Sequence, residues 1–300
     1  MDSEVREKYL KAGAIAAAAR EYGRSLIKEG ANVFDVAEAV EAFVVKEGGQ
    51  PAFPCCLSFN EDAAHYSPMV GDTLTFKTGD VVKLDVGVQV DGYIGDTAYT
   101  VEVGTDRYQS LREATAAALE AAIAVVCDGA EIRDIGAAIE HEIRSRGFNP
   151  VANLTGHSVD KYHQHAGLTI PNIAATGHGR LKAGQVIAIE PFATTGAGRI
   201  KDSGPGHIYH FRTARPQRNP DAKAALKYIQ ENHPRLPFSE RWVARAIPAA
   251  KVPFAMRLLE QTGAITQYPI LREIQNGQVS QTEHTVIVTE TGCEVTTRAR

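Results

Sequence analysis

The sequence predicts an α/β protein of mixed (α+β) type, built from two copies of one helix–helix–strand–strand unit. Three pairs of similar segments occur in the same order in both parts of the chain. They are "GANVFDVAEAVE" from Gly30 with "GAEIRDIGAAIE" from Gly129, "KTGDVVKLD" from Lys77 with "KAGQVIAIE" from Lys182, and, more weakly, "DTAYTV" from Asp96 with "EHTVIV" from Glu283. Apolar segments can resemble each other by chance, but three matches in the same order make this explanation a poor one. With only two copies, a solenoid is excluded.

Each copy begins with two helices. The second helix of each has a stripe of apolar residues at helical spacing, formed by Val33, Val36, Val40 and Val44, and by Ile132, Ile135, Ile139 and Ile143. Asn32 is placed to cap the first of these helices, and Gly48 and Gly147 occupy left-handed C-cap positions. Longer alanine-rich stretches at 6–29 and 107–127 predict the preceding helices.

A hairpin follows the first helix pair, over 81–100. Asp91-Gly92 favours a type I′ turn, which pairs each residue i with residue 183 − i, so that Asp85 faces Ala98 and Asp96 lies diagonally opposite. The even-numbered residues from Val82 to Val90 are all apolar and are expected to pack on the helices. Both aspartates therefore point toward the second copy.

The second copy contains an insertion. Asp85 and Asp96 are 11 residues apart, whereas their counterparts Glu190 and Glu283 are 93 apart. Within this excess, 211–263 predicts three helices, at 221–232, 239–247 and 249–262, in a winged-helix-like arrangement. We expect a catalytic domain of 1–210 plus 264–300 and an inserted subdomain of 211–263. The insertion has ten Lys or Arg against four Asp or Glu, a net charge of +6 in a chain of −4.

Composition limits the class of protein. Hydrophobic content of 44% supports a large core, and the net charge of −4 gives no overall sign of a nucleic-acid partner. The charged N-terminal stretch is not a signal peptide, so we expect a cytoplasmic protein. Four cysteines without a Cys-x-x-Cys motif favour reduced structural thiols over a zinc site.

The repeat brings four acids together: Asp85, Asp96, Glu190 and Glu283. Two like charges ~4 Å apart repel by about 4 kcal/mol at an effective dielectric of 20, so protons or cations must compensate. Two divalent ions would neutralise four carboxylates. An oxygen-rich shell with an imidazole suits manganese, iron, cobalt or zinc. His157, which precedes Glu190 by 33 residues, is the favoured imidazole. His163 and His165 share a strand face, and parity does not choose between them.

At these residues the chain resembles the methionine aminopeptidases, specifically the type 2 branch and its archaeal form. The matching segments are "AAHY", "KLDVG", "GHS", "HAG", "IEPFATTG" and "QTEHT". The resemblance implies a pita-bread fold with internal pseudo-twofold symmetry and two divalent metal ions. It also implies hydrolytic removal of the initiator methionine by a metal-activated hydroxide, with a small second residue preferred.

The resemblance also implies a role for each site residue. Asp96 and Glu283 bridge both metals, Asp85 completes one, and His157 with Glu190 completes the other. His65 and His165 contact the substrate. For the mechanism, we expect a neutral His165 to stabilise the oxyanion and Glu190 to relay a proton to the leaving amine. The methionine side chain is held by Phe53, Phe192 and Tyr268, although spacing alone fits ordinary core aromatics equally well. At Gln164 the chain departs from the aliphatic residue that members often carry.

Two alternatives remain open at this point. A relative of the same fold that cleaves Xaa-Pro bonds, as a prolidase does, would have a similar metal shell. The other alternative is a non-catalytic protein that binds RNA or the ribosome through the basic 211–263 segment. Such a relative should have lost metal ligands, and all five are present here. In the enzyme, the same segment either contacts the ribosome transiently or is a solvated surface. We expect the partner to be a peptide or nascent-protein N-terminus, and the protein to be a monomer with no membrane contact.

Overall fold

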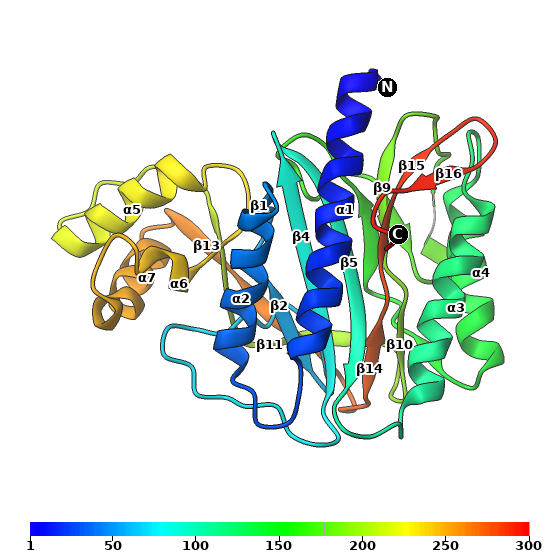
Figure 1. Cartoon of the computed structure of the whole chain (residues 1–300), viewed down its shortest axis with the longest axis horizontal. Coiled ribbons are helices and arrows are strands. Elements are labelled where there is room, and N and C mark those ends of the chain that lie inside the picture. The colour runs from blue at the N-terminus through cyan, green and yellow to red at the C-terminus, as the bar shows by residue number, and fades with distance from the viewer. Residues whose placement is uncertain (177, 300) are drawn as a thin grey trace.

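The computed structural model describes residues 1–176 and 178–299. Four long helices lie on one side of the strands: α1 (Ser3–Leu26), α2 (Val33–Lys46), α3 (Gln109–Val125) and α4 (Ile132–Ser145). Figure 1 shows α1 in front of the first hairpin, α2 on one side of α1, α3 and α4 on the other, and the inserted helices at the end beyond α2. Asn32 caps α2 by accepting a hydrogen bond from the Asp35 amide. Gly48 and Gly147 have φ values of 84° and 81°, as the C-cap prediction requires.

The strands form four small sheets. The first sheet contains β1 (Gln50–Pro51), β2 (Cys56–Phe59), β4 (Val81–Val90) and β5 (Tyr93–Glu102). Its counterpart in the second half contains β7 (Thr155–Ser158), β8 (Thr169–Pro171), β9 (Val186–Ile189), β15 (His284–Val288) and β16 (Cys293–Val295). A three-stranded sheet contains β6 (Asn149–Pro150), β10 (Phe192–Thr194) and β14 (Val279–Gln281). The last contains β3 (Asp62–Ala64), β11 (Ile200–Phe211), β12 (Phe238–Ser239) and β13 (Ile265–Glu273).

Each half packs its helix pair on its own strands. One apolar core joins α1 and α2 to the even-numbered valines and leucine of β4, and a second joins α3 and α4 to β9 and β15. The halves meet where β5 approaches β15. There the Thr285 hydroxyl accepts from the Asp96 amide and donates to the Asp96 carbonyl, both at 2.8 Å, and the Glu283 amide donates to Ala98 at 3.0 Å. The predicted duplicated α/β architecture is therefore confirmed, and its two acid-bearing strands meet at the centre.

The segment between β11 and β13 has an apolar core of its own. It contains α5 (Pro220–Asn232), α6 (Glu240–Val243) and α7 (Val252–Gln261), packed together around Trp242. The helix predicted over 239–247 is wrong in length, because α6 ends at Val243. Beyond it, Arg245 and Ala246 donate to carbonyls three residues earlier, as in a turn, and Pro248 has no N–H with which to continue a helix. Within 1–176 and 178–299, no helix has the length and apolarity needed to cross a membrane.

Candidate metal centre and substrate cavity

The ten site residues predicted from the sequence all line one cavity of about 370 Å³. Both halves of the chain contribute to it, and so do β11 and β13. The ten are Phe53, His65, Asp85, Asp96, His157, His165, Glu190, Phe192, Tyr268 and Glu283. Gln164, where the chain departs from the pattern it resembles, lines the same cavity. The fold thus collects residues that are far apart in the sequence into a single site.

The hairpin places the two aspartates as its turn chemistry predicts. Asp91 and Gly92 both have positive φ, 53° and 91°, which is the type I′ geometry. Asp85 is paired with Ala98, and Asp96 is paired with Gly87, so the two aspartates lie diagonally on one face. The predicted register is confirmed, and it holds both carboxylates away from the helices.

The second half supplies the imidazole and two glutamates. His157 lies on β7 and pairs with Ala188 of β9, Glu190 directly follows β9, and Glu283 directly precedes β15. His157 Nε2 is 3.7 Å from Asp96 Oδ2 and 3.8 Å from Glu190 Oε1. Ligand atoms of Asp96, His157 and Glu283 all lie within 4.8 Å of one another, and all three side chains are buried. This spacing matches a set of donors around a common cation.

Gln281 connects the acids and was not predicted from the sequence. Its Nε2 is 3.3 Å from Asp85 Oδ2, 3.3 Å from Glu190 Oε2 and 3.4 Å from Glu283 Oε2. The available signal was parity, because Gln281 precedes Glu283 by two residues and shares its strand face. One neutral amide cannot offset the charge of three carboxylates.

Burial and mutual repulsion disfavour the charged forms of these acids. Burial raises the pKa of Asp85 to about 7. It also raises the pKa of Asp96, Glu190 and Glu283 well above their ordinary values, and the charges of neighbouring acids raise each of the three further. Burial lowers the pKa of His157 to about 3, which keeps the imidazole neutral and able to ligate. Only protons or cations can stabilise this cluster.

The donor set fits divalent cations. Asp85 Oδ1 and Asp96 Oδ1 are buried without a hydrogen-bond partner, although buried carboxylate oxygens are normally paired. Four carboxylates balance the charge of two divalent cations, and together with one neutral imidazole they form the oxygen-rich ligand set typical of a hydrolytic metal site. The arrangement can therefore bind metal without rearrangement of the backbone.

Two histidines that are not in this cluster face the same space. His65 Nδ1 is 3.1 Å from the Pro269 carbonyl, which fixes the proton on Nδ1 and leaves Nε2 as an acceptor. Burial lowers the pKa of His65 to about 4. The His165 ring lies edge-on to His157, 4.3 Å between centroids, at the exposed mouth of the cavity. Burial lowers the pKa of His165, and the nearby His163 and His210 lower it further. His163 is exposed and lies outside the lining.

Apolar side chains form one wall of the cavity. Phe53, Ile208 and Tyr268 belong to one apolar cluster, and Phe192 lies in the adjoining core. The Phe53 ring covers Gly87, where a Cβ atom would lie 2.1 Å from the ring. Glycine between the two candidate aspartate ligands is therefore what allows Phe53 to reach the cavity. This role of Gly87 was not predicted from the sequence.

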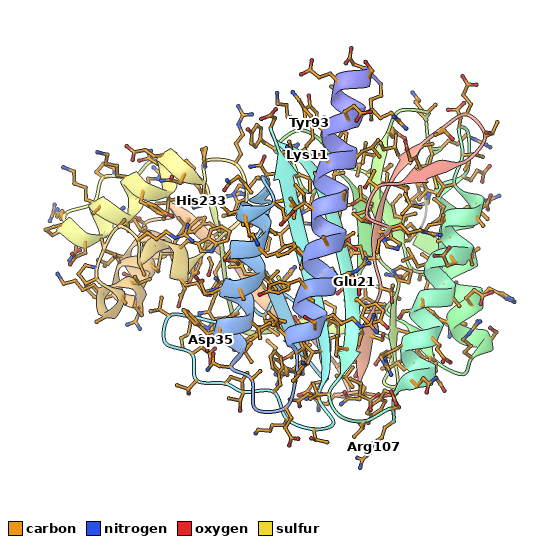
Figure 2. The ribbon with its side chains drawn as sticks, viewed as in Figure 1. Lys11, Glu21, Asp35, Tyr93, Arg107 and His233 are labelled. Atoms are coloured by element: carbon orange, nitrogen blue, oxygen red, sulfur yellow. The ribbon has the colours of Figure 1, made fainter. Side chains whose placement is uncertain are left out.

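A larger cavity, of about 840 Å³, lies outside this site. It lies beside the contact of α2 with the inserted helices and is lined by Glu38, Glu41, Trp242 and Arg245 among others. His233, which Figure 2 labels where the inserted helices meet α2, also lines it. None of the ten site residues contributes to this cavity. Among the residues that the structure describes, its acids and His233 do not form a metal-ligand cluster of the kind found between the strands.

Comparison with known proteins gives close relatives over nearly the full chain. A methionine aminopeptidase of Thermococcus kodakarensis is 48% identical over 293 residues, covering 97% of this chain and 99% of the relative. A methionine aminopeptidase of Methanocaldococcus jannaschii is 44% identical over 298 residues, covering 99% and 100%.

Solved structures share the fold at lower identity. A methionine aminopeptidase of Thermotoga maritima aligns with a TM-score of 0.73 at 24% identity, over 99% of this chain and 98% of that one. A thermophilic Arx1 aligns with a TM-score of 0.81 at 16% identity, over 99% and 91%. A prolidase of Pyrococcus furiosus aligns with a TM-score of 0.63 at 19% identity, over 100% and 65%. Residues 7–290 match metallopeptidase family M24. The chain therefore belongs to metallopeptidase family M24.

Proposed function

We propose that this chain is a metal-dependent exopeptidase that removes N-terminal methionine from peptides and new proteins. The observation that carries this proposal is the single cavity, in which a five-residue ligand set adjoins two free histidines and an apolar wall. The relatives from Thermococcus kodakarensis and Methanocaldococcus jannaschii, which match nearly the whole chain, are both named for this activity.

Asp85, Asp96, His157, Glu190 and Glu283 would hold two divalent cations, with Asp96 and Glu283 shared between them. Cobalt, manganese, iron and zinc all suit these ligands. When bound, the metals supply Lewis acidity and lower the pKa of a water molecule into the neutral range. Asp85 would serve one ion only, because Asp96, on the neighbouring strand β5, lies at the contact between the halves.

The chain's own residues orient the peptide and move its protons. Neutral His165 donates an N–H to the oxygen of the scissile carbonyl as charge develops there. His65, with its proton held on Nδ1 by Pro269, offers Nε2 as an acceptor for an N–H of the substrate. Glu190 accepts the proton of the attacking water and passes it to the leaving amine. The amide of Gln281 holds this carboxylate in place.

The apolar wall selects the first side chain. Phe53, Phe192 and Tyr268 enclose a space that suits an unbranched, polarizable methionine side chain. Burial of such a side chain contributes about 1.5–3 kcal/mol. Gln164 also lines this cavity, so its amide would be available to the substrate.

We assign the chain to the type 2 branch in its archaeal form, on the basis of the helical segment between β11 and β13. Residues 211–263 would form the inserted, winged-helix-like subdomain, and 1–210 plus 264–300 the catalytic domain. Nine of the ten cations of the insertion are exposed, which favours a solvated basic surface that covers the site; a transient contact with the ribosome is the alternative. We further infer a monomer that works in the cytoplasm, where new chains carry their initiator methionine.

One experiment separates this function from its rival in the same fold, prolidase-type cleavage. The chain is stripped with a chelator, each of the four metals is restored separately, and Met-Ala, Met-Val and Ala-Pro peptides are compared. We expect metal-dependent cleavage in the order Met-Ala, then Met-Val, with no cleavage of Ala-Pro. A preference for Ala-Pro would overturn the proposal in favour of the prolidase alternative.

A further inference from the structure

A buried ion pair joins the inserted segment to the first half of the chain. Arg241 on α6 and Glu41 on α2 are 4% and 6% exposed. Arg241 Nη1 donates to Glu41 Oε2 at 2.8 Å, and Nη2 donates to Glu41 Oε1 at 2.6 Å. The Trp242 indole donates to the same carboxylate at 2.7 Å. This is a bidentate pair in which every carboxylate oxygen has partners.

The pair also holds two loops of the catalytic half. Glu41 Oε1 accepts from the Cys55 amide at 2.9 Å. Arg241 donates to the Pro68 carbonyl at 3.1 Å and to the Ser67 hydroxyl at 3.2 Å. That hydroxyl in turn donates to the Cys55 carbonyl at 3.0 Å. The backbone amide and the backbone carbonyl of Cys55 are therefore both held by the same hydrogen-bond network.

These two loops, around residues 53–57 and 65–68, supply Phe53 and His65 to the lining of the cavity. Cys55 lies two residues after Phe53 and directly before Cys56, which pairs with Asp85 on the neighbouring strand. Ser67 lies two residues after His65, whose backbone has a φ of 71° and is held in that unusual conformation. A shift of either loop would move Phe53 or His65 relative to the candidate metal ligands.

The energetics of buried ion pairs favour a role for this pair in fixing the positions of the two loops over a role in stabilising the fold. Burial of two charges costs several kcal/mol per ion, and apolar pairs of similar volume often stabilise a fold equally well. An arginine fork instead fixes distances and angles to several acceptors at once. The pair is therefore suited to hold loops in register.

We propose that Arg241 and Glu41 are positioning residues for the substrate cavity, so that the inserted segment sets the selectivity for the first side chain. This inference rests on the proposed methionine aminopeptidase function. It makes the insertion a part of the specificity pocket, although none of its charged groups enters the cavity.

The test uses the full chain loaded with manganese and two variants. They are R241K and the double variant R241M/E41Q, which removes both charges of the pair and leaves Glu38, the second carboxylate bonded to Arg241. R257M, at an exposed arginine of α7 in the same insertion, is the matched control. The ratio of kcat/KM for Met-Ala-Ser to that for Leu-Ala-Ser is measured, because this ratio does not depend on the folded fraction. Hydrogen exchange of the 53–57 and 65–68 amides and the bound manganese are measured in parallel.

We expect the Met/Leu ratio to fall about tenfold in both variants, with faster exchange in both loops and unchanged manganese content. R257M should match the parent chain. An unchanged ratio in folded R241K would overturn the inference, and so would failure of both variants to fold, since the pair would then serve stability alone. If the parent chain cleaves neither peptide, the proposed function fails instead, and loop exchange in R241K still decides the positioning role.

Discussion

Replacement of Asp85 by asparagine should make the metal-free protein more stable than the parent chain. It should make the metal-loaded protein less stable than the metal-loaded parent. Asp85 is the candidate ligand whose pKa burial raises from 3.8 to about 7. Asparagine has nearly the same shape, and its side-chain oxygen can still accept from Gln281 Nε2. The variant thus removes a charge and leaves the hydrogen bond possible.

The magnitude follows from proton linkage. The folded chain binds the Asp85 proton more tightly than the unfolded chain does. The stability of the metal-free protein therefore falls as the pH rises from about 4 to about 7, and remains lost above it. The difference between 3.8 and about 7 corresponds to about 4 kcal/mol in the free energy of unfolding. At roughly 2 °C per kcal/mol, D85N without metal should melt about 8 °C above the parent at pH 8.

Melting curves in chelator and in manganese, at pH 8 and pH 4.5, provide the assay. At pH 4.5 the metal-free difference should shrink below about 1 kcal/mol, because Asp85 is then largely protonated in the folded parent. In manganese at pH 8 the order should reverse, since the variant lacks a ligand. D134N, at an exposed position of α4, is the control. A D85N variant that melts with the parent in chelator and gains as much from manganese would refute the reasoning.

Three further predictions concern the same cavity. Glu283→Gln should lower manganese affinity more than about 100-fold in calorimetry and abolish turnover, and full activity would contradict its role as a shared ligand. Phe53→Ala should reduce kcat/KM for Met-Ala about 10- to 100-fold, as expected from about 1.5–3 kcal/mol of lost burial, and should leave manganese binding intact. An unchanged kcat/KM would show that Phe53 does not contact the methionine side chain. Gly87→Ala should have a similar effect on kcat/KM, because its Cβ would lie 2.1 Å from the Phe53 ring. A Gly87→Ala chain with parental kinetics would show that the ring moves freely.

The hairpin and its acids were predictable because local rules decide them. A two-residue turn of Asp91-Gly92 fixes the register, and strict alternation from Val82 to Val90 fixes the faces, so the positions of Asp85 and Asp96 followed directly. The second half then followed from the internal repeat. The length of α6 did not, because the turn after Val243 depends on Pro248 and on packing of the inserted core.

The supporting residues could not be predicted, because their partners lie far away in the sequence. Glu41 and Arg241 are separated by 200 positions, and neither has a local pattern that distinguishes it from a surface charge on a helix. In the sequence, Gln281 looks like any amide in a strand, and only the fold shows that three carboxylates surround it. Gly87 is one glycine among 26 until Phe53 covers it. Chemistry-bearing residues were thus visible in the sequence, whereas the contacts that hold them were not.

Anomalous diffraction from crystals of the manganese-loaded chain tests the ligand assignment most directly. We predict two anomalous peaks in the cavity, one contacted by Asp85 and the other by His157 and Glu190, with Asp96 and Glu283 touching both. Absence of manganese from this cavity, or a manganese ion bound there without Asp96 and Glu283, would contradict the assignment.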